Sequence, residues 1–194
     1  MTADTVGGVW NYSLDLSREL GRQGIEVALA TMGRLLSPDQ AREAAAIPRL
    51  QVHESDYRLE WMEDPWSDLR RAGDWLLDLE RTVRPDVVHL NGYVHASLPW
   101  SVPTLVVCHS CVLSWWQAVK GEKAPCEWNR YRDEVRRGLQ DAGLVLAPSR
   151  AMLAEAERIY GPFRKADVIP NARDARAFAP APKEPFVFSA GRFW

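Results

Sequence analysis

Short apolar runs that alternate with helix-like segments constrain the fold of this chain more than any other feature. The runs with the length and Val/Leu/Ile content of β-strands are residues 2–6, 25–32, 50–53, 86–91, 104–108, 144–147 and 166–169. Segments with helical spacing or helix-forming composition lie between most of them, at residues 9–20, 38–46, 66–83, 127–141 and 149–160. Strands that are apolar on both faces are typical of a parallel sheet covered by helices on both sides. The sequence therefore predicts an α/β fold built on a doubly wound parallel sheet.

The charge balance and composition exclude several classes of protein. The 194 residues include 24 Lys and Arg and 26 Asp and Glu, a formal net charge of −2, without the basic surplus typical of nucleic-acid binding. No apolar run approaches the roughly 18 residues that a membrane span needs. The first residues lack the basic and apolar regions of a signal peptide. We therefore expect a cytoplasmic protein without a transmembrane segment.

A proline-rich stretch marks the candidate domain boundary. Residues 177–185 have the composition of a linker and contain Pro180, Pro182 and Pro185. Residues 1–176 are then one domain, and residues 186–194 are the first strand of a second. A strand stub at the start and a strand without a partner helix at the end predict that the chain is part of a longer protein.

Polar side chains follow the predicted strands at the points where they end. In open parallel sheets, ligands bind beyond the carboxyl ends of the strands. That position is occupied by Asn91, Tyr93, His95, His109, Ser110, Ser149, Arg150 and Asn171. His109 can hydrogen-bond a substrate hydroxyl or take its proton. Ser149 is better explained as the N-cap of the helix that follows it. For each of the others, a cap or turn role is the alternative.

Two glycines separate the first strand from the first helix. Gly7 and Gly8 would allow close approach of a ligand to the backbone, and the N-terminus of the following helix attracts an anion such as a diphosphate. The pair lacks the spacing of the dinucleotide-binding fingerprint. A plain tight turn remains the alternative.

The cysteine and tryptophan residues suggest two further hypotheses about function. Cys108 and Cys111 form a C-x-x-C, which would suit a thiol–disulfide oxidoreductase; no second ligand pair supports a zinc site. The chain contains nine Trp, whose flat apolar faces suit sugar binding, although a Trp-rich core is the plainer explanation. Trp115 and Trp116 are adjacent and point to different sides of any element, so we expect one of them to line an acceptor site.

Taken in order, the motifs resemble those of glycosyltransferase family 4, which has the GT-B fold. The segments that carry the resemblance are the glycine loop 7–10, the D-V-V-H segment 86–92, the strand and His of 106–110, the serine-capped helix after 147–150, the V-I-P-N of 168–171, and the Gly-Arg of 190–192. They span nearly the whole chain.

The resemblance implies two Rossmann-like domains that face a cleft, with the acceptor in the N-terminal domain and a UDP- or GDP-linked sugar in the C-terminal one. It implies a reaction with retention of anomeric configuration and without a metal or other cofactor. By the same resemblance, Gly7, Gly8 and Arg192 would bind the donor diphosphate, and His109 would act in catalysis. Acceptor contacts are expected from Asn91, Tyr93 and His95.

The chain departs from the family pattern in two respects. Ala172 follows Asn171 where many members have Gly, and the donor-binding lysine and E-x7-E region would fall after Trp194. We therefore expect the acceptor half of a hexosyltransferase, inactive by itself. Its partners would be a nucleotide-sugar and a sugar or lipid-linked acceptor, with peripheral membrane contact allowed and no nucleic acid. The alternatives are the oxidoreductase and a non-catalytic carbohydrate-binding module.

Overall fold

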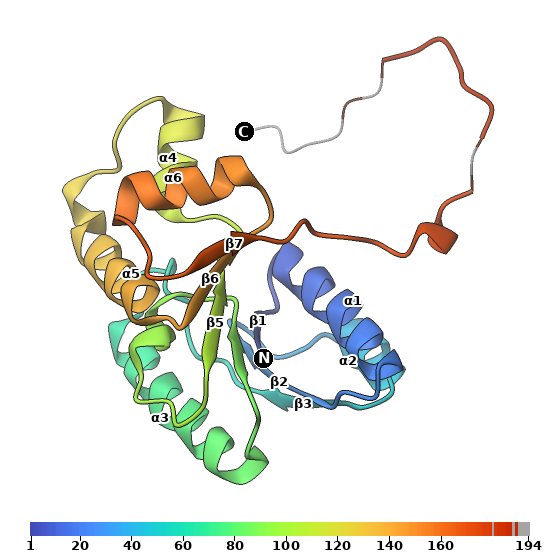
Figure 1. Cartoon of the computed structure of the whole chain (residues 1–194), viewed down its shortest axis with the longest axis horizontal. Helices are drawn as coiled ribbons and strands as arrows, with labels where there is room; N and C mark the ends of the chain where they lie inside the picture. Colours follow the sequence, from blue (N-terminus) through green and yellow to red (C-terminus); the bar gives the residue numbers. More distant parts are fainter. Residues whose placement is uncertain (180, 188, 190–194) are drawn as a thin grey trace.

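The structure is a computed structural model, and it describes residues 1–179, 181–187 and 189. Every paired strand in this part of the chain runs parallel to its neighbour. The strands are β1 (Thr2–Asp4), β2 (Val27–Met32), β3 (Leu50–Glu54), β4 (Val88–Leu90), β5 (Thr104–Val107), β6 (Leu144–Ala147) and β7 (Ala166–Val168). The predicted α/β fold with a parallel sheet is confirmed (Figure 1).

The strands form two sheets that meet edge to edge. One has the order β1-β2-β3 and the other β4-β5-β6-β7. At the junction, the Asn91 amide side chain donates to the Thr2 carbonyl (2.7 Å), and the Asn91 backbone N–H donates to Thr2 Oγ1 (3.0 Å). The chain therefore winds outward in opposite directions from β1 and β4. In a doubly wound sheet this switch point is where a ligand-binding crevice opens.

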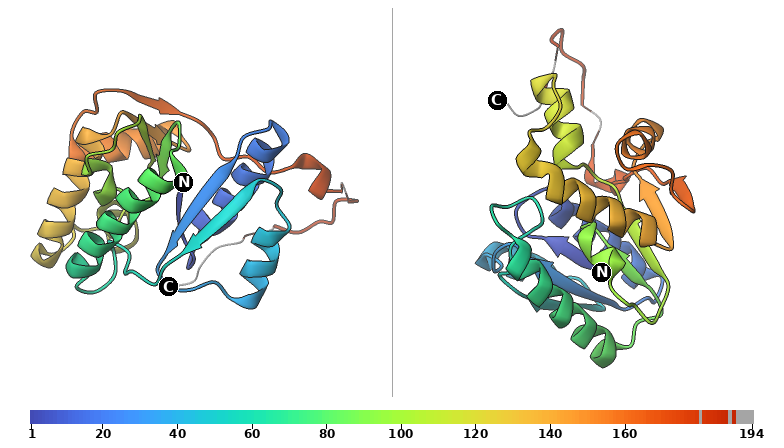
Figure 2. Two further views of the ribbon diagram at one scale, coloured as in Figure 1. Left: turned by 90° about the horizontal axis from the view of Figure 1, so that it is seen from below. Right: turned by 90° about the vertical axis from the view of Figure 1, so that its left-hand side faces the viewer.

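Helices cover both faces of the sheet. They are α1 (Gly8–Arg22), α2 (Pro38–Ala45), α3 (Trp66–Val83), α4 (Val112–Lys120), α5 (Asn129–Asp141) and α6 (Arg150–Tyr160), with short 3-10 turns η1 (Val94–Ser97), η2 (Cys126–Trp128) and η3 (Ala175–Ala177). Figure 2 shows α1 and α2 on one side of the strands, and α3 and α5 on the other. No helix among the described residues is long and apolar enough to cross a bilayer.

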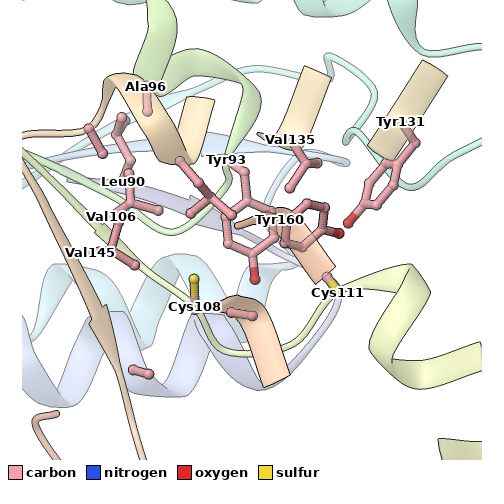
Figure 3. Close-up of a cluster of buried hydrophobic side chains, with 14 of the residues drawn as sticks. Leu90, Tyr93, Ala96, Val106, Cys108, Cys111, Tyr131, Val135, Val145 and Tyr160 are labelled. Carbon is pink, nitrogen blue, oxygen red and sulfur yellow. The ribbon is translucent and has the colours of Figure 1, made fainter. Parts of the chain in front are cut away.

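Separate cores lie under the two groups of helices. The larger one joins β4, β5 and β6 to α5 and α6, and includes Leu90, Val106, Val145, Val135 and Tyr160 (Figure 3). The smaller one packs α1 and α2 on β2, and includes Trp10, Leu14, Leu29, Ala44 and Ile47. Together they hold the carboxyl ends of β1, β4 and β5 in fixed positions.

Local sequence explains where several helices begin. Ser37 and Gln40 form a reciprocal capping box in front of α2, with Pro38 at its first position. Ser149 Oγ accepts the Met152 N–H (3.1 Å), so the predicted N-cap of α6 is confirmed. α1 instead begins at Gly8, after Gly7, without a side-chain cap.

Two sequence-based expectations are corrected. The spacing of Val9, Ser13, Leu16 and Leu20 in the sequence predicts that they share the helical face of α1 that packs inward. The buried residues of α1 are instead Trp10, Ser13, Leu14 and Ser17. α4 was not predicted, because its apolar side chains lack a helical period and its N-cap is a cysteine. Residues 186, 187 and 189 are not in a strand, and residue 188 lies outside the described residues, so the strand predicted at 186–189 stays a prediction. Arg192 and the rest of 190–194 lie outside the described residues.

Candidate active site

Polar side chains from β4 and β5 meet beside the switch point. Asn91 follows β4, and His109 follows β5. Asn91 Oδ1 lies 2.9 Å from Nε2 of His109 and 3.2 Å from Nε2 of His89. Two residues predicted from the carboxyl ends of the strands, Asn91 and His109, are therefore in direct contact. His89, which the carboxyl-end rule does not identify, joins them.

The orientation of the Asn91 amide fixes the tautomers of both imidazoles. Its Nδ2 lies 2.7 Å from the Thr2 carbonyl, which can only accept, so Nδ2 is the donor there. Oδ1 therefore faces the two imidazoles and accepts from each. Both His89 and His109 must then carry their proton on Nε2. This leaves Nδ1 of His109 as a lone-pair acceptor.

Burial keeps His109 neutral. Its ring packs edge-on against Tyr12, with 4.6 Å between ring centroids. Desolvation lowers the pKa of His109 to about 4, against the opposite effect of the nearby Asp4 carboxylate. The pKa of His89 is also lowered to about 4, mainly by burial. At neutral pH, His109 is therefore a fixed, uncharged imidazole that can accept a proton or a hydrogen bond at Nδ1.

Asp4 ends β1 and shapes the loop that leads into α1. Its Oδ1 accepts the backbone N–H groups of Gly7 (2.8 Å) and Val6 (3.0 Å). The same carboxylate acts electrostatically on His109. Sequence alone does not identify Asp4, because the predicted strand runs two residues further; an acidic residue at the end of the first strand was the available signal.

The glycine loop leaves open space in front of α1. A Cβ on Gly8 would meet nothing within 4 Å, and Gly7 has an ordinary φ of −133°. Packing therefore does not require Gly8. Gly138 is the opposite case, because a Cβ there would lie 1.9 Å from the Tyr93 carbonyl oxygen. Free space and an uncapped helix N-terminus suit an anion at Gly7 and Gly8.

Tyr93 and His95 are buried, and their side chains already have polar partners. The Tyr93 hydroxyl donates to the Ser110 carbonyl (2.6 Å). His95 Nε2 lies 2.9 Å from the Leu69 carbonyl and donates to it, which ties η1 to α3. Both residues line the cavity described next. Their protein contacts give them a positioning role in its wall.

A cavity of about 440 Å³ connects the switch point to an aromatic wall. His109, Asn91 and Asp4 line it, together with Glu60, Trp61, Trp115, Trp116 and Trp128. Glu60 is only 8% exposed, and its Oε2 accepts the backbone N–H groups of Tyr93 and Val94 (3.0 Å each). Burial raises the pKa of Glu60 to about 7 despite these two hydrogen bonds. Sequence does not distinguish Glu60 from its many acidic neighbours.

The cysteines do not have the properties of a redox centre. Cys108 and Cys111 are buried free thiols. Burial raises the pKa of Cys108 to about 12, whereas a redox thiol needs a lowered pKa. Cys111 Sγ accepts the Ser114 N–H (3.3 Å) and caps α4. The described residues contain no group of three or more His, Cys, Asp or Glu side chains that could hold a metal ion.

Comparison with models of known protein families identifies the family of this chain. The model of Glycosyltransferase Family 4 matches residues 6–176. The chain belongs to glycosyltransferase family 4. The match covers the glycine loop, His109 and Asn91, and most of the residues that line the cavity of this family 4 chain. No curated protein sequence matches it.

Two solved structures are similar to this chain. LpCGTa, solved in complex with UDP, has a TM-score of 0.53 and 14% identity over 87% of this chain and 52% of that one. The Glycyrrhiza uralensis UGT73P12, complexed with glycyrrhetinic acid 3-O-monoglucuronide, has a TM-score of 0.49 and 11% identity over 86% of this chain and 48% of that one. The likeness to LpCGTa confirms one Rossmann-like half of a GT-B fold. The family 4 chain thus spans about half the length of these structures.

Proposed function

We propose that this family 4 chain is the acceptor half of a hexosyltransferase that moves a hexosyl group from a nucleotide-sugar to an acceptor hydroxyl, with retention. The observation that carries the proposal is the pairing of His109 with Asn91 beside the open N-terminus of α1. The site combines a neutral hydrogen-bonding group with space for an anion. Sugar transfer from a nucleoside diphosphate needs both.

On the donor side, the loop before α1 supplies the anion site. The diphosphate would approach Gly7 and Gly8, where a Cβ on Gly8 would meet nothing within 4 Å. The partial positive charge of the helix N-terminus then stabilises the negative charge that grows on the leaving diphosphate. Arg192 would add a fixed cation in the same role.

On the acceptor side, His109 acts at Nδ1. Its Nε2–H is donated to Asn91, so the imidazole is held in one orientation and one tautomer. Nδ1 can accept a hydrogen bond from a hydroxyl of the transferred sugar or of the acceptor. A neutral imidazole supplies this acceptor at neutral pH without adding a positive charge that would compete for the diphosphate.

Product analysis with the natural protein tests this proposal. The protein purified from its own cells is incubated with UDP- and GDP-linked hexoses and a panel of acceptors, and nucleoside diphosphate release is measured. We expect release from one donor, and a product whose anomeric proton coupling matches that of the donor sugar. Inverted configuration would overturn retention, and no release with any donor would overturn the transferase.

The 194-residue chain itself provides a second test. We propose that it does not turn over alone, because its 194 residues contain no counterpart of the donor-binding lysine and E-x7-E region that the family pattern implies. The expected result is no sugar transfer by the purified chain with the donor that the natural protein uses. Detectable transfer would contradict this part of the proposal.

A further inference from the structure

The cavity contains a buried carboxylate that the proposed transfer step does not use. Every hydrogen bond to the Glu60 carboxylate within the described residues ends on Oε2, which accepts the Tyr93 and Val94 N–H groups. Oε1 has no such partner there, although the residue is only 8% exposed and lines the cavity. Oε1 is not fully enclosed by protein atoms, so a donor group brought by a ligand can reach it.

Aromatic rings form the wall beside this carboxylate. Trp116 packs against Trp115 and Trp128, with ring centroids 5.8 Å and 6.5 Å away. The Trp116 indole N–H is buried without a hydrogen-bond partner in the described part of the chain. Trp61, which is 43% exposed, lines the same cavity. Flat apolar faces next to an unpaired acceptor and an unpaired donor fit a polyhydroxylated ring.

The charges that line the cavity favour some ligands over others. Glu60 and Asp4 are acidic, and Arg58 is the basic residue. The Arg58 guanidinium points to the exposed backbone carbonyl of Glu63, to which it donates (2.7 Å). Burial lowers the pKa of His95, as it does that of His109, so neither imidazole adds positive charge at neutral pH. An anionic ligand next to the tryptophan wall would therefore be repelled by the Glu60 carboxylate, which is mostly ionised above pH 7.

We propose that Glu60 determines acceptor specificity: its Oε1 accepts a hydrogen bond from a hydroxyl or ammonium group of a non-acidic sugar ring stacked on the tryptophan wall, and its charge excludes acidic sugars. This inference rests on the proposed function, because it takes the cavity as the acceptor site. It adds a charge rule to that function, and the rule can be measured by binding alone.

Binding of three sugars that differ in charge tests the rule on the unmodified 194-residue chain. The probes are methyl glucoside, glucosamine and glucuronate, titrated at constant ionic strength and at pH 8, where most of the Glu60 carboxyl is ionised. Indole N–H signals in ¹H–¹⁵N spectra, assigned by Trp→Phe variants, report where each probe binds. We expect shifts of the signals from Trp116 and Trp128, with those of Trp10 and Trp100, which lie outside the cavity, unchanged. Glucuronate should bind at least about tenfold more weakly than methyl glucoside.

Substitution of Glu60 then assigns the rule to this residue. Glu60→Gln keeps the oxygen that accepts the Tyr93 and Val94 N–H groups, replaces Oε1 by an NH2 donor to which a sugar hydroxyl can still hydrogen-bond, and removes the charge. It should strengthen glucuronate binding about tenfold, weaken glucosamine binding by a similar factor, and change methyl glucoside binding less than about threefold. Glu63→Gln, on the exposed side of the same loop, is the matched control and should change none of the three. If Glu60→Gln does not fold, Glu60→Asp keeps the charge and should still exclude glucuronate.

Several outcomes would overturn the inference. They are glucuronate binding as tight as that of methyl glucoside, unchanged constants in Glu60→Gln, or no shift of the cavity indoles by any probe. Failure of the proposed function looks different. If the three probes bind in the predicted order of affinity but the natural protein releases no nucleoside diphosphate, the specificity rule for Glu60 is supported and the proposed transferase activity is refuted. If sugar transfer occurs but the affinity of the probes does not depend on their charge, only the specificity rule is refuted.

Discussion

Replacing Glu60 by glutamine should change the pH dependence of stability in a way that can be calculated from the site. Burial raises the pKa of this carboxyl from 4.5 to about 7 in the folded protein. Between these values the folded chain keeps a proton that the unfolded chain has lost, so wild-type stability falls as pH rises. At 1.36 kcal/mol for each tenfold change in proton affinity, the loss is ~3 kcal/mol by pH 8.

The side-chain amide of the Glu60→Gln variant does not titrate, so the variant avoids this loss. Its free energy of unfolding should equal that of the wild type near pH 4.5 and exceed it by ~3 kcal/mol at pH 8, or about 6–12 °C in Tm. Buried histidines destabilise both proteins equally at low pH, and their contribution cancels in the difference.

Urea denaturation, followed by circular dichroism from pH 4.5 to pH 8, measures the effect. Glu63→Gln, at an exposed position of the same loop, is the control and should follow the wild type throughout. A stability difference between Glu60→Gln and wild type that does not grow with pH would refute the claim that folding buries this charge. A variant less stable than wild type at every pH would do the same.

Three further predictions follow from the same geometry. The pKa of His109 lies near 4 because of burial, and its proton is on Nε2, so ¹⁵N shifts should report the Nε2–H tautomer from pH 6 to pH 8; protonation at pH 6 would contradict this. Gly8→Ala should leave Tm within a few degrees while weakening donor binding, whereas Gly138→Ala should cost at least ~3 kcal/mol in urea denaturation, and equal Tm values would refute the contrast. The exposed thiol of Cys126 should react rapidly with a thiol reagent and that of Cys108 only on unfolding; fast reaction of both would revive the redox alternative.

The strand pattern could be predicted because a parallel sheet buries both of its faces. Runs such as 27–32 and 144–147 are apolar at nearly every position, which separates them from helices and from half-exposed strands. The face of α1 could not be predicted as well. Ser13 and Ser17 are polar in sequence but small, and they allow the helix to pack closely on the sheet. Leu16 remains half-buried instead.

The position of the candidate site could be predicted from the sequence, but the hydrogen bonds and the burial of its residues could not. The rule that ligands bind at the carboxyl ends of strands identifies Asn91 and His109 from sequence. The Asn91 amide oxygen accepts hydrogen bonds from both His109 and His89. It can do so because the Thr2 carbonyl, distant in sequence, fixes the orientation of the amide, and the sequence does not show that contact. Glu60 lies in a loop, and only the tertiary fold buries it.

The most direct measurement for the central claim is the turnover of His109→Ala in the natural protein, compared with wild type. The assay is release of nucleoside diphosphate at saturating donor and acceptor, with circular dichroism to establish that the variant is folded. His53→Ala, on β3 at the sheet edge, is the control and should retain full turnover. The account predicts a loss of about 10²-fold or more in His109→Ala. Near-normal turnover in a folded His109→Ala variant would contradict it and would exclude the His109–Asn91 pair from the chemistry.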